Sequence, residues 1–130
     1  MLKAQHMWKL GCLLLMLSVI MGAFAAHALK SVLDVQAKHW WDLAVSYQRT
    51  HALALLACAL VYPYVTNLKR LHWVSVCLIA GSFFFCGSLY LMALTHIKIL
   101  GAITPIGGTL WIVAWILACT LHWKVDQQSS

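Results

Sequence analysis

Polar and basic side chains occupy only a few places in this otherwise apolar sequence. Arg49 stands between Gln48 and His51 in the second apolar run. Other candidates lie near the ends of the neighbouring runs: His27, Tyr90, Thr95, His96 and Thr104. Arginine offers phosphate or carboxylate a planar fork of N–H donors, and histidine and tyrosine can complete the coordination. We therefore predict one basic polar pocket that would bind an anionic headgroup or a small anion.

Arg49 also has a simpler interpretation. A cation one to two turns inside an apolar helix costs about 3 kcal/mol or more unless it pairs, lines water or extends to the headgroups. Asp42 shares its helical face but lies about 10 Å away along the axis, which is too far for an ion pair. The simpler interpretation has the Arg49 side chain extend along the helix to the headgroups.

A second candidate feature interrupts the last apolar run. Pro105 removes a helical hydrogen bond to the carbonyl of Gly101, and Gly107 and Gly108 permit a bend or the close approach of another backbone. The pattern predicts a helix kink that packs against the first apolar run. In its functional version the helix is broken, and the free carbonyl faces the polar pocket, as in transporters.

The acidic residues argue against catalysis. All three, Asp34, Asp42 and Asp126, lie outside the apolar runs, and glutamate is absent. No carboxylate within the runs is therefore available as a general base, and no nucleophile stands in a recognisable motif. We expect a protein that is not an enzyme and has no cofactor.

Metal binding is also disfavoured. Spacings of 12, 12 and 45 residues separate His27, His39, His51 and His96 and match no metal-ligand motif. The five cysteines all fall within apolar runs and lack CxxC spacing, which is typical of small apolar fillers. A thiolate metal site is the less favoured alternative for four of them: Cys12, Cys58, Cys77 and Cys119.

The composition identifies the elements that must position these residues. Hydrophobic residues make up 63% of the chain, charged residues 9%, and the mean hydropathy is +0.84, whereas about 25% of residues in soluble domains are charged. A helix needs roughly 20 apolar residues to cross a bilayer, so 130 residues hold four crossings. We predict an all-α integral membrane four-helix bundle, a single transmembrane domain covering 1–130, with spans at about 8–26, 44–65, 73–94 and 99–123.

The first span imitates a cleavable signal peptide, because Lys3 and Lys9 precede an apolar core and then small residues. Small residues also recur on one helical stripe suited to packing against another span: Gly11, Ser18, Gly22 and Ala26. A disposable segment has no need of such a stripe. We expect the span to remain in the mature protein.

An amphipathic helix is predicted from Ser31 to Asp42, with Ser31 as its N-cap. We expect it to run without a break into the second span, which Pro63 ends, and to place Trp40 and Trp41 in the headgroup layer. Tryptophans mark the predicted span ends as an aromatic belt: Trp8, Trp40, Trp41, Trp73 and Trp123.

Basic residues give the orientation. Five lie on one predicted side (Lys3, Lys9, Lys69, Arg70 and Lys124) and three on the other (Lys30, Lys38 and Lys98). The positive-inside rule then predicts that both termini are cytoplasmic and the amphipathic segment periplasmic. Because the bases flank apolar runs, membrane retention and anionic lipid explain the net charge of +6 better than nucleic acid does.

Four blocks of sequence resemble a known family: MGAFAAHAL at 21–29, YQRTHALAL at 47–55, GSLYLMAL at 87–94 and GAITPIGG at 101–108. They are similar to the signature blocks of the small uncharacterised inner-membrane family that includes bacterial YgdD and YwdK. The resemblance covers about residues 8–120 and implies an uncleaved four-span protein of the bacterial inner (plasma) membrane, but no reaction. This chain has Ala25 and Ala28 where members commonly have glycine. The family also tolerates uncharged residues at the position of Arg49, which favours Gln48 and His51 as the important polar residues.

Two functions remain after these exclusions. The first is a non-enzymatic membrane component that binds a partner membrane protein, another copy of itself or anionic membrane lipid. The alternative is an oligomeric transporter or channel that moves a small anionic or neutral solute through the polar pocket.

Overall fold

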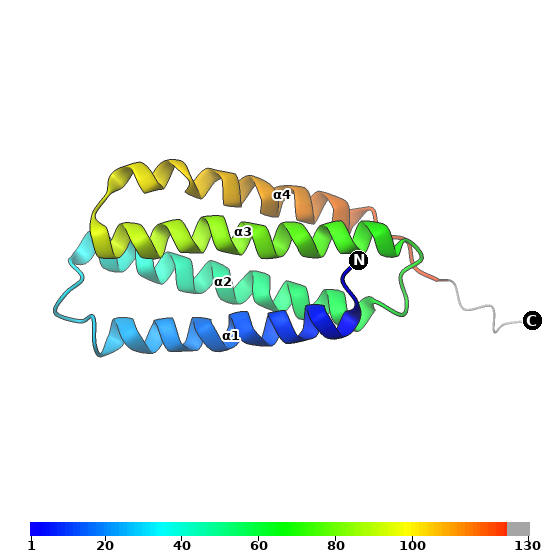
Figure 1. Cartoon of the computed structure of the whole chain (residues 1–130), viewed down its shortest axis with the longest axis horizontal. Helices are drawn as coiled ribbons and strands as arrows, with labels where there is room; N and C mark the ends of the chain where they lie inside the picture. The colour runs from blue at the N-terminus through cyan, green and yellow to red at the C-terminus, as the bar shows by residue number, and fades with distance from the viewer. Residues whose placement is uncertain (125–130) are drawn as a thin grey trace, which may run out of the picture.

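The computed structural model describes residues 1–124 of the chain, and these residues form long helices lying side by side (Figure 1). The helices are α1 (Ala4–Ala26), α2 (Val35–Val61), α3 (Leu68–Thr95) and α4 (Thr104–Cys119), and a short 3₁₀ helix, η1 (Lys98–Ala102), precedes α4. Successive long helices run in opposite directions. The structure confirms the predicted all-α, four-helix fold.

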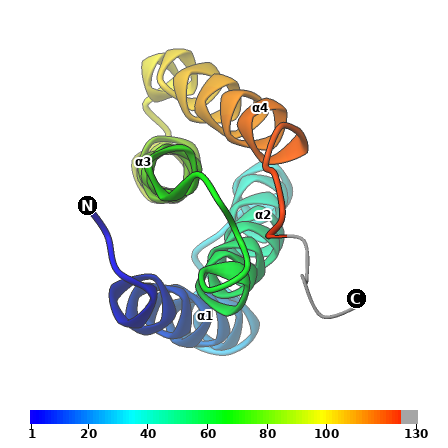
Figure 2. The ribbon, with the colours of Figure 1, turned by 90° about the vertical axis from the view of Figure 1, so that its right-hand side faces the viewer.

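The long helices form an open row in which α1 packs against α2, α2 against α3, and α3 against α4. In the end-on view, α1 and α4 lie at opposite edges of the molecule (Figure 2). The expectation that the start of the last helix packs against the first helix is therefore wrong, because α4 docks on α3 instead.

Three segments of the described chain are long and apolar enough to cross a membrane: Ala4–Ala26, Leu68–Thr95 and Lys98–Cys119. Helix α2 has a similar length of 27 residues, but Gln48, Arg49 and His51 near its middle lower its hydropathy. Because α2 lies between α1 and α3, we expect it to cross the membrane with them. Gln48 and His51 are buried against its neighbours, whereas Arg49 is exposed.

Helix α2 begins later than predicted. Its N-cap is Asp34, whose Oδ1 accepts a 2.7 Å hydrogen bond from the backbone N–H of Ala37. The predicted cap at Ser31 is wrong, since residues 27–32 form a turn in place of a first helical turn. A carboxylate at a helix N-terminus is favoured by both hydrogen bonding and charge. The helix then runs unbroken to Val61, two residues before Pro63.

The ends of α3 and α4 also differ from the prediction. Helix α3 starts at Leu68 because Asn67 caps it, its side chain accepting a hydrogen bond from the backbone N–H of Arg70 at 2.9 Å. Helix α4 ends at Cys119 rather than near Trp123. The residues after it fold back beside the α2–α3 loop, where the backbone N–H of Thr66 donates to the carbonyl of His122 at 3.0 Å.

Small residues let α1 approach α2 closely. A Cβ on Gly11 would lie 3.2 Å from the Ala52 carbonyl oxygen and 2.6 Å from a methyl of Leu56. Ser18 is also fully buried, whereas Ala26 is exposed and its neighbour Ala25 is buried in its place. The predicted stripe is therefore correct except at its last position.

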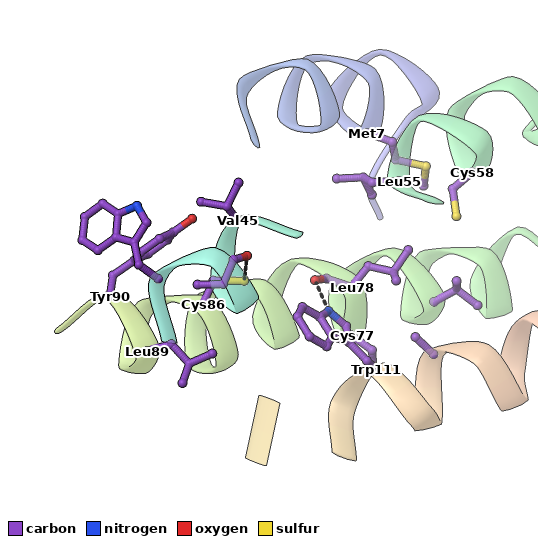
Figure 3. Packing of buried hydrophobic residues seen from close by; sticks show 14 of the residues in the cluster. Met7, Val45, Leu55, Cys58, Cys77, Leu78, Cys86, Leu89, Tyr90 and Trp111 are labelled. Carbon is purple, nitrogen blue, oxygen red and sulfur yellow. Dashed lines mark hydrogen bonds between the residues drawn. The ribbon is translucent and has the colours of Figure 1, made fainter. Parts of the chain in front are cut away.

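Large apolar side chains fill the space between the helices, as the close view of the core shows (Figure 3). Met7 of α1 and Leu55 of α2 are completely buried. Cys77, Gly81 and Ser88 share the buried face of α3, as their spacing predicts. Much apolar surface stays exposed on α1 and α4, the edge helices of the row.

Candidate functional site

Gln48 and Tyr90 form a hydrogen-bonded pair in the interior of the bundle. The Tyr90 hydroxyl donates to Oε1 of Gln48 at 2.8 Å, and Nε2 of Gln48 donates to the carbonyl of Leu14 at 2.9 Å. The two residues are only 4% and 8% exposed. These two hydrogen bonds therefore join α3, α2 and α1. Gln48 lies at the middle of α2, so the connection is in the interior of the protein.

Trp41 lies two helical turns before Gln48 on α2 and also contacts both α1 and α3. Its Nε1–H donates to the carbonyl of Met21 at 2.8 Å, and its ring meets that of Tyr90 nearly edge-on, with centroids 4.7 Å apart. The residue is 3% exposed. The Trp41 ring is thus enclosed by the protein, and a carbonyl of α1, in place of a lipid headgroup, satisfies its indole N–H.

The contacts between α1 and α2 repeat with the helical period. Trp41 and Gln48 are seven residues apart, and so are their acceptors, Met21 and Leu14. Since the helices are antiparallel, both donors face their acceptors in register. A carbonyl oxygen has two lone pairs, so each acceptor can keep its own helical hydrogen bond.

A hollow of about 300 Å³ opens beside the Gln48–Tyr90 pair, between α1 and α3. Its walls are largely apolar and come from both helices, with Leu14, Leu17, Met21, Ile79, Phe83 and Cys86 among them. The Nε2 of Gln48 carries two hydrogens, and its bond to Leu14 uses one. The hollow thus offers an apolar surface with a hydrogen-bond donor at its base.

His51 belongs to a separate aromatic cluster between α2 and α4. Its ring lies flat on that of Trp111, with centroids 3.6 Å apart and an angle of 3° between the planes. Tyr47 stacks on Trp111 as well, at 5.7 Å. His51 is 5% exposed. These rings connect α2 to α4, although the two helices are not neighbours in the row.

The hydrogen bonds of His51 define its tautomer. Nδ1 lies 2.8 Å from the carbonyl oxygen of Tyr47, which can only accept. The indole Nε1–H of Trp115, which can only donate, points to Nε2 at 3.3 Å. His51 therefore carries its proton on Nδ1 and is neutral, with both ring nitrogens used inside the protein.

The Pro105 region joins α4 to α3. Pro105 lies in the first turn of α4, where a missing N–H costs no helical bond, so the predicted interior kink is wrong and the chain changes there from 3₁₀ to α helix. A Cβ on Gly107 would lie 2.4 Å from the backbone nitrogen of Phe85, whereas one on Gly108 would lie 3.8 Å from the Phe85 ring. Gly107 permits the close backbone approach, and Thr104 Oγ1 lies 2.7 Å from Ser88 Oγ.

The remaining candidates lie away from these contacts. Arg49 is exposed, and within residues 1–124 no recorded hydrogen bond or ion pair involves it. Thr95, His96 and His27 are exposed at the end of the bundle that carries the α1–α2 and α3–α4 connections. There His96 Nδ1 lies 3.9 Å from Asp34 Oδ2. The predicted residues are thus distributed over several places and do not line one pocket.

The described residues also show where the acids and possible metal ligands lie. Asp42 pairs with Lys38 on the exposed surface of α2, and Asp126 is outside the described residues. Among residues 1–124, no three histidine, cysteine or acidic side chains are grouped so as to hold one metal ion.

Comparison with known proteins gives the family. A family model described as "Protein of unknown function (DUF423)" matches residues 21–108. A UPF0382 membrane protein of Staphylococcus saprophyticus is 45% identical over 116 residues, which are 89% of this chain and 95% of the relative. This chain belongs to the UPF0382 family. The UPF0382 membrane protein YwdK of Bacillus subtilis is 36% identical over 108 residues, 83% of this chain and 88% of YwdK.

A third relative comes from another genus. A UPF0382 membrane protein of Haemophilus influenzae is 41% identical over 98 residues, 75% of this chain and 77% of the relative. The predicted resemblance to the family of YwdK is therefore confirmed, and the chain is a multi-pass membrane protein. No solved structure matches it.

Several residues that organise the interior of this UPF0382 protein escape sequence reasoning. Trp111 and Trp115 donate to α3 and to His51 respectively. Their positions contain a usable signal, because they lie within the last apolar run and away from its ends. An indole N–H at such depth needs an acceptor inside the protein. Tyr47 offers no comparable signal.

Proposed function

We propose that this UPF0382 protein is a non-enzymatic membrane component that binds a partner membrane protein, a second copy of itself or anionic lipid. One observation carries the proposal. Within residues 1–124, every buried side-chain nitrogen or oxygen has a hydrogen-bond partner in the chain itself. The polar interior is therefore used to hold the helices together, as polar residues do in membrane bundles.

The identity of the donors and acceptors supports this structural role. Side-chain N–H groups of Trp41, Gln48 and Trp111 all donate to backbone carbonyls of an adjacent helix. Such bonds fix the position of one helix against the next. The described carboxylates, Asp34 and Asp42, are exposed near the ends of helices, so a general base is not available beside the buried polar groups.

The second candidate function is an oligomeric transporter or channel for a small anionic or neutral solute. The hollow beside Gln48 favours it, because that hollow places a hydrogen-bond donor near the middle of the bundle. Leu14 takes one Nε2 hydrogen of Gln48, and the amide oxygen accepts from Tyr90, so the second Nε2 hydrogen is the group that a solute would bind.

Two measurements separate these functions. Cross-linking with mass spectrometry in native membranes should give one constant companion, a self-contact or cross-linked lipid if the first proposal is correct. Proteoliposomes with the purified protein should show no flux of small anions or neutral solutes above protein-free vesicles. Flux that disappears in Gln48→Ala and His51→Ala variants, with helicity retained, would establish the transporter instead.

A further inference from the structure

A hollow flanked by two basic residues lies where α3 begins and α4 ends. This end of the bundle also holds the N-terminus (Figure 1). Its volume is about 300 Å³, and Asn67, Lys69, Arg70, Trp73 and Leu117 line it. Two of these residues are cations, and Trp73 and Leu117 supply an apolar wall. The exposed atoms inside the hollow are almost all carbon, so Lys69 and Arg70 line it with their alkyl stems and add positive charge beside an apolar surface.

Arg70 is held in position at this hollow. One of its Nη atoms donates to the carbonyl of Thr120, just after the end of α4, at 2.6 Å. A guanidinium has five N–H donors, so most of them remain available to an anion. Lys69 is exposed, and in the described part of the chain no recorded hydrogen bond or ion pair involves it. Arg70 is thus preorganised, and Lys69 is free to move onto a ligand.

Among residues 1–124, the charged side chains at this end of the bundle are all positive. Lys3, Lys9 and Lys124 lie at the same end of the bundle, whereas the acids of residues 1–124, Asp34 and Asp42, lie toward the opposite end. An anion at the hollow therefore meets no nearby carboxylate of the described chain. The attraction is electrostatic and extends over about 8–10 Å at physiological salt.

Trp73 indicates the depth of the hollow. Its side chain is 51% exposed and lies one turn from the start of α3, and tryptophan rings at helix ends sit at headgroup level. Leu117 lies on the last turn of α4, a helix otherwise rich in exposed apolar residues. A ligand that fits must therefore carry an anion at headgroup level and apolar carbons beside it.

We propose that this hollow binds an anionic phospholipid, with Lys69 and Arg70 contacting the phosphate and Trp73 and Leu117 contacting the glycerol and the first acyl carbons. Inorganic phosphate would match the cations but leave the apolar wall unused. The inference deepens the lipid-binding part of the proposed function and rests on it. It assigns the lipid to the end of the bundle opposite His27 and His96.

Native mass spectrometry of the full chain in detergent, titrated with phosphatidylglycerol or phosphatidylethanolamine, tests the assignment. We expect preferential binding of phosphatidylglycerol and about fivefold weaker binding in Lys69→Gln, because a lysine near an anionic membrane surface contributes on the order of 1 kcal/mol. Lys69→Arg should retain binding. The matched control is Lys9→Gln, which removes the same charge at the same end of the bundle outside the hollow and should change affinity less than twofold.

Other outcomes would overturn the site. Equal losses in Lys69→Gln and Lys9→Gln would show general charge attraction, and displacement of the lipid by equimolar inorganic phosphate would show a simple anion site. Trp73→Ala, with helicity checked by circular dichroism, should also weaken phosphatidylglycerol binding. Unchanged affinity would show that Trp73 does not contact the lipid and would overturn the proposed apolar part of the site. Solute flux with intact phosphatidylglycerol selectivity would refute the proposed function and leave this lipid site standing.

Discussion

The Tyr90 hydroxyl donates a 2.8 Å hydrogen bond to the side-chain oxygen of Gln48, and the amide nitrogen of Gln48 passes the connection to α1. One side chain at the middle of α2 thus holds a neighbour on each side. The hydrophobic effect does not drive helices together in lipid, so hydrogen bonds between helices help to determine which helices pack against each other.

The pair should be energetically coupled. Tyr90→Phe removes the hydroxyl but keeps the ring against Trp41, and we expect it to lower the free energy of unfolding by about 0.5–1.5 kcal/mol. Gln48→Leu should cost at least as much. The double variant should cost about 1 kcal/mol less than the sum, because each single change already breaks the shared bond. Unfolding in mixed micelles, followed by circular dichroism, measures all three.

Tyr47→Phe is the matched control, since no recorded hydrogen bond in residues 1–124 involves the Tyr47 hydroxyl. It should change the unfolding free energy by less than about 0.5 kcal/mol. Strict additivity of Tyr90→Phe and Gln48→Leu would show that the two side chains do not depend on each other.

Gly107 and Gly108 should respond very differently to the same added methyl. A Cβ at Gly107 would lie 2.4 Å from the backbone nitrogen of Phe85 and 2.7 Å from the carbonyl oxygen of Gly81, so α4 must move away from α3. We expect Gly107→Ala to cost about 1–3 kcal/mol of unfolding free energy. Gly108→Ala meets only the Phe85 ring at 3.8 Å and should be neutral or slightly stabilising. The reverse order of stabilities would contradict the observed docking of α4.

Much of the fold can be predicted from sequence, because apolar runs of sufficient length specify helices in lipid. The helix ends are less predictable, since neighbouring polar residues compete to cap them. Ser31 and Asp34 both precede an apolar periodic segment, and the carboxylate of Asp34 prevails. The end of α4 depends on pairing of residues 120–124 with the α2–α3 loop, a long-range contact that local sequence does not encode.

The candidate site is harder to predict for a related reason. Their closeness in the sequence predicts one site for Gln48, Arg49 and His51, but nearby positions on a helix face different neighbours. Gln48 and His51 are about 60° apart around α2, and Gln48 contacts α1 and α3 while His51 contacts α4. Which neighbour each residue meets depends on the open row of helices, and spacing along the chain contains no information about that row.

Replacing Arg49 with leucine should leave stability unchanged or raise it. The side chain is exposed, and no recorded bond to another described residue would be lost, whereas its charge within a membrane helix carries a cost of about 3 kcal/mol. Unfolding of Arg49→Leu in bicelles, compared with Gln48→Leu, measures the difference. A loss above about 1 kcal/mol would mean that Arg49 has a partner in the membrane.

The orientation with both termini cytoplasmic remains a prediction that labelling can check. In a background with all five cysteines replaced, Lys98→Cys should react with a membrane-impermeant maleimide added from the periplasmic side, and Lys3→Cys should not. Lys3 directly precedes α1 and Lys98 begins η1. The start of α1 and the α3–α4 connection lie at opposite ends of the bundle (Figure 1). Labelling of Lys3→Cys alone would mean that the protein has the opposite orientation in the membrane. Labelling of both variants would contradict the crossing of the membrane by α1 and α3.

The tautomer of His51 is the most specific consequence of the aromatic cluster. Because the Tyr47 carbonyl can only accept and the Trp115 indole can only donate, Nδ1 must carry the proton and Nε2 must be bare. Solid-state ¹⁵N NMR of the protein in bilayers should therefore show one histidine in this less common neutral form, and its signals should vanish in His51→Gln. Trp115→Phe should shift the Nε2 signal and leave Nδ1 nearly unchanged, since only the donor to Nε2 is removed. A proton on Nε2 would mean that Trp115 does not face the ring, and the link between α2 and α4 would then depend on stacking with Trp111 alone.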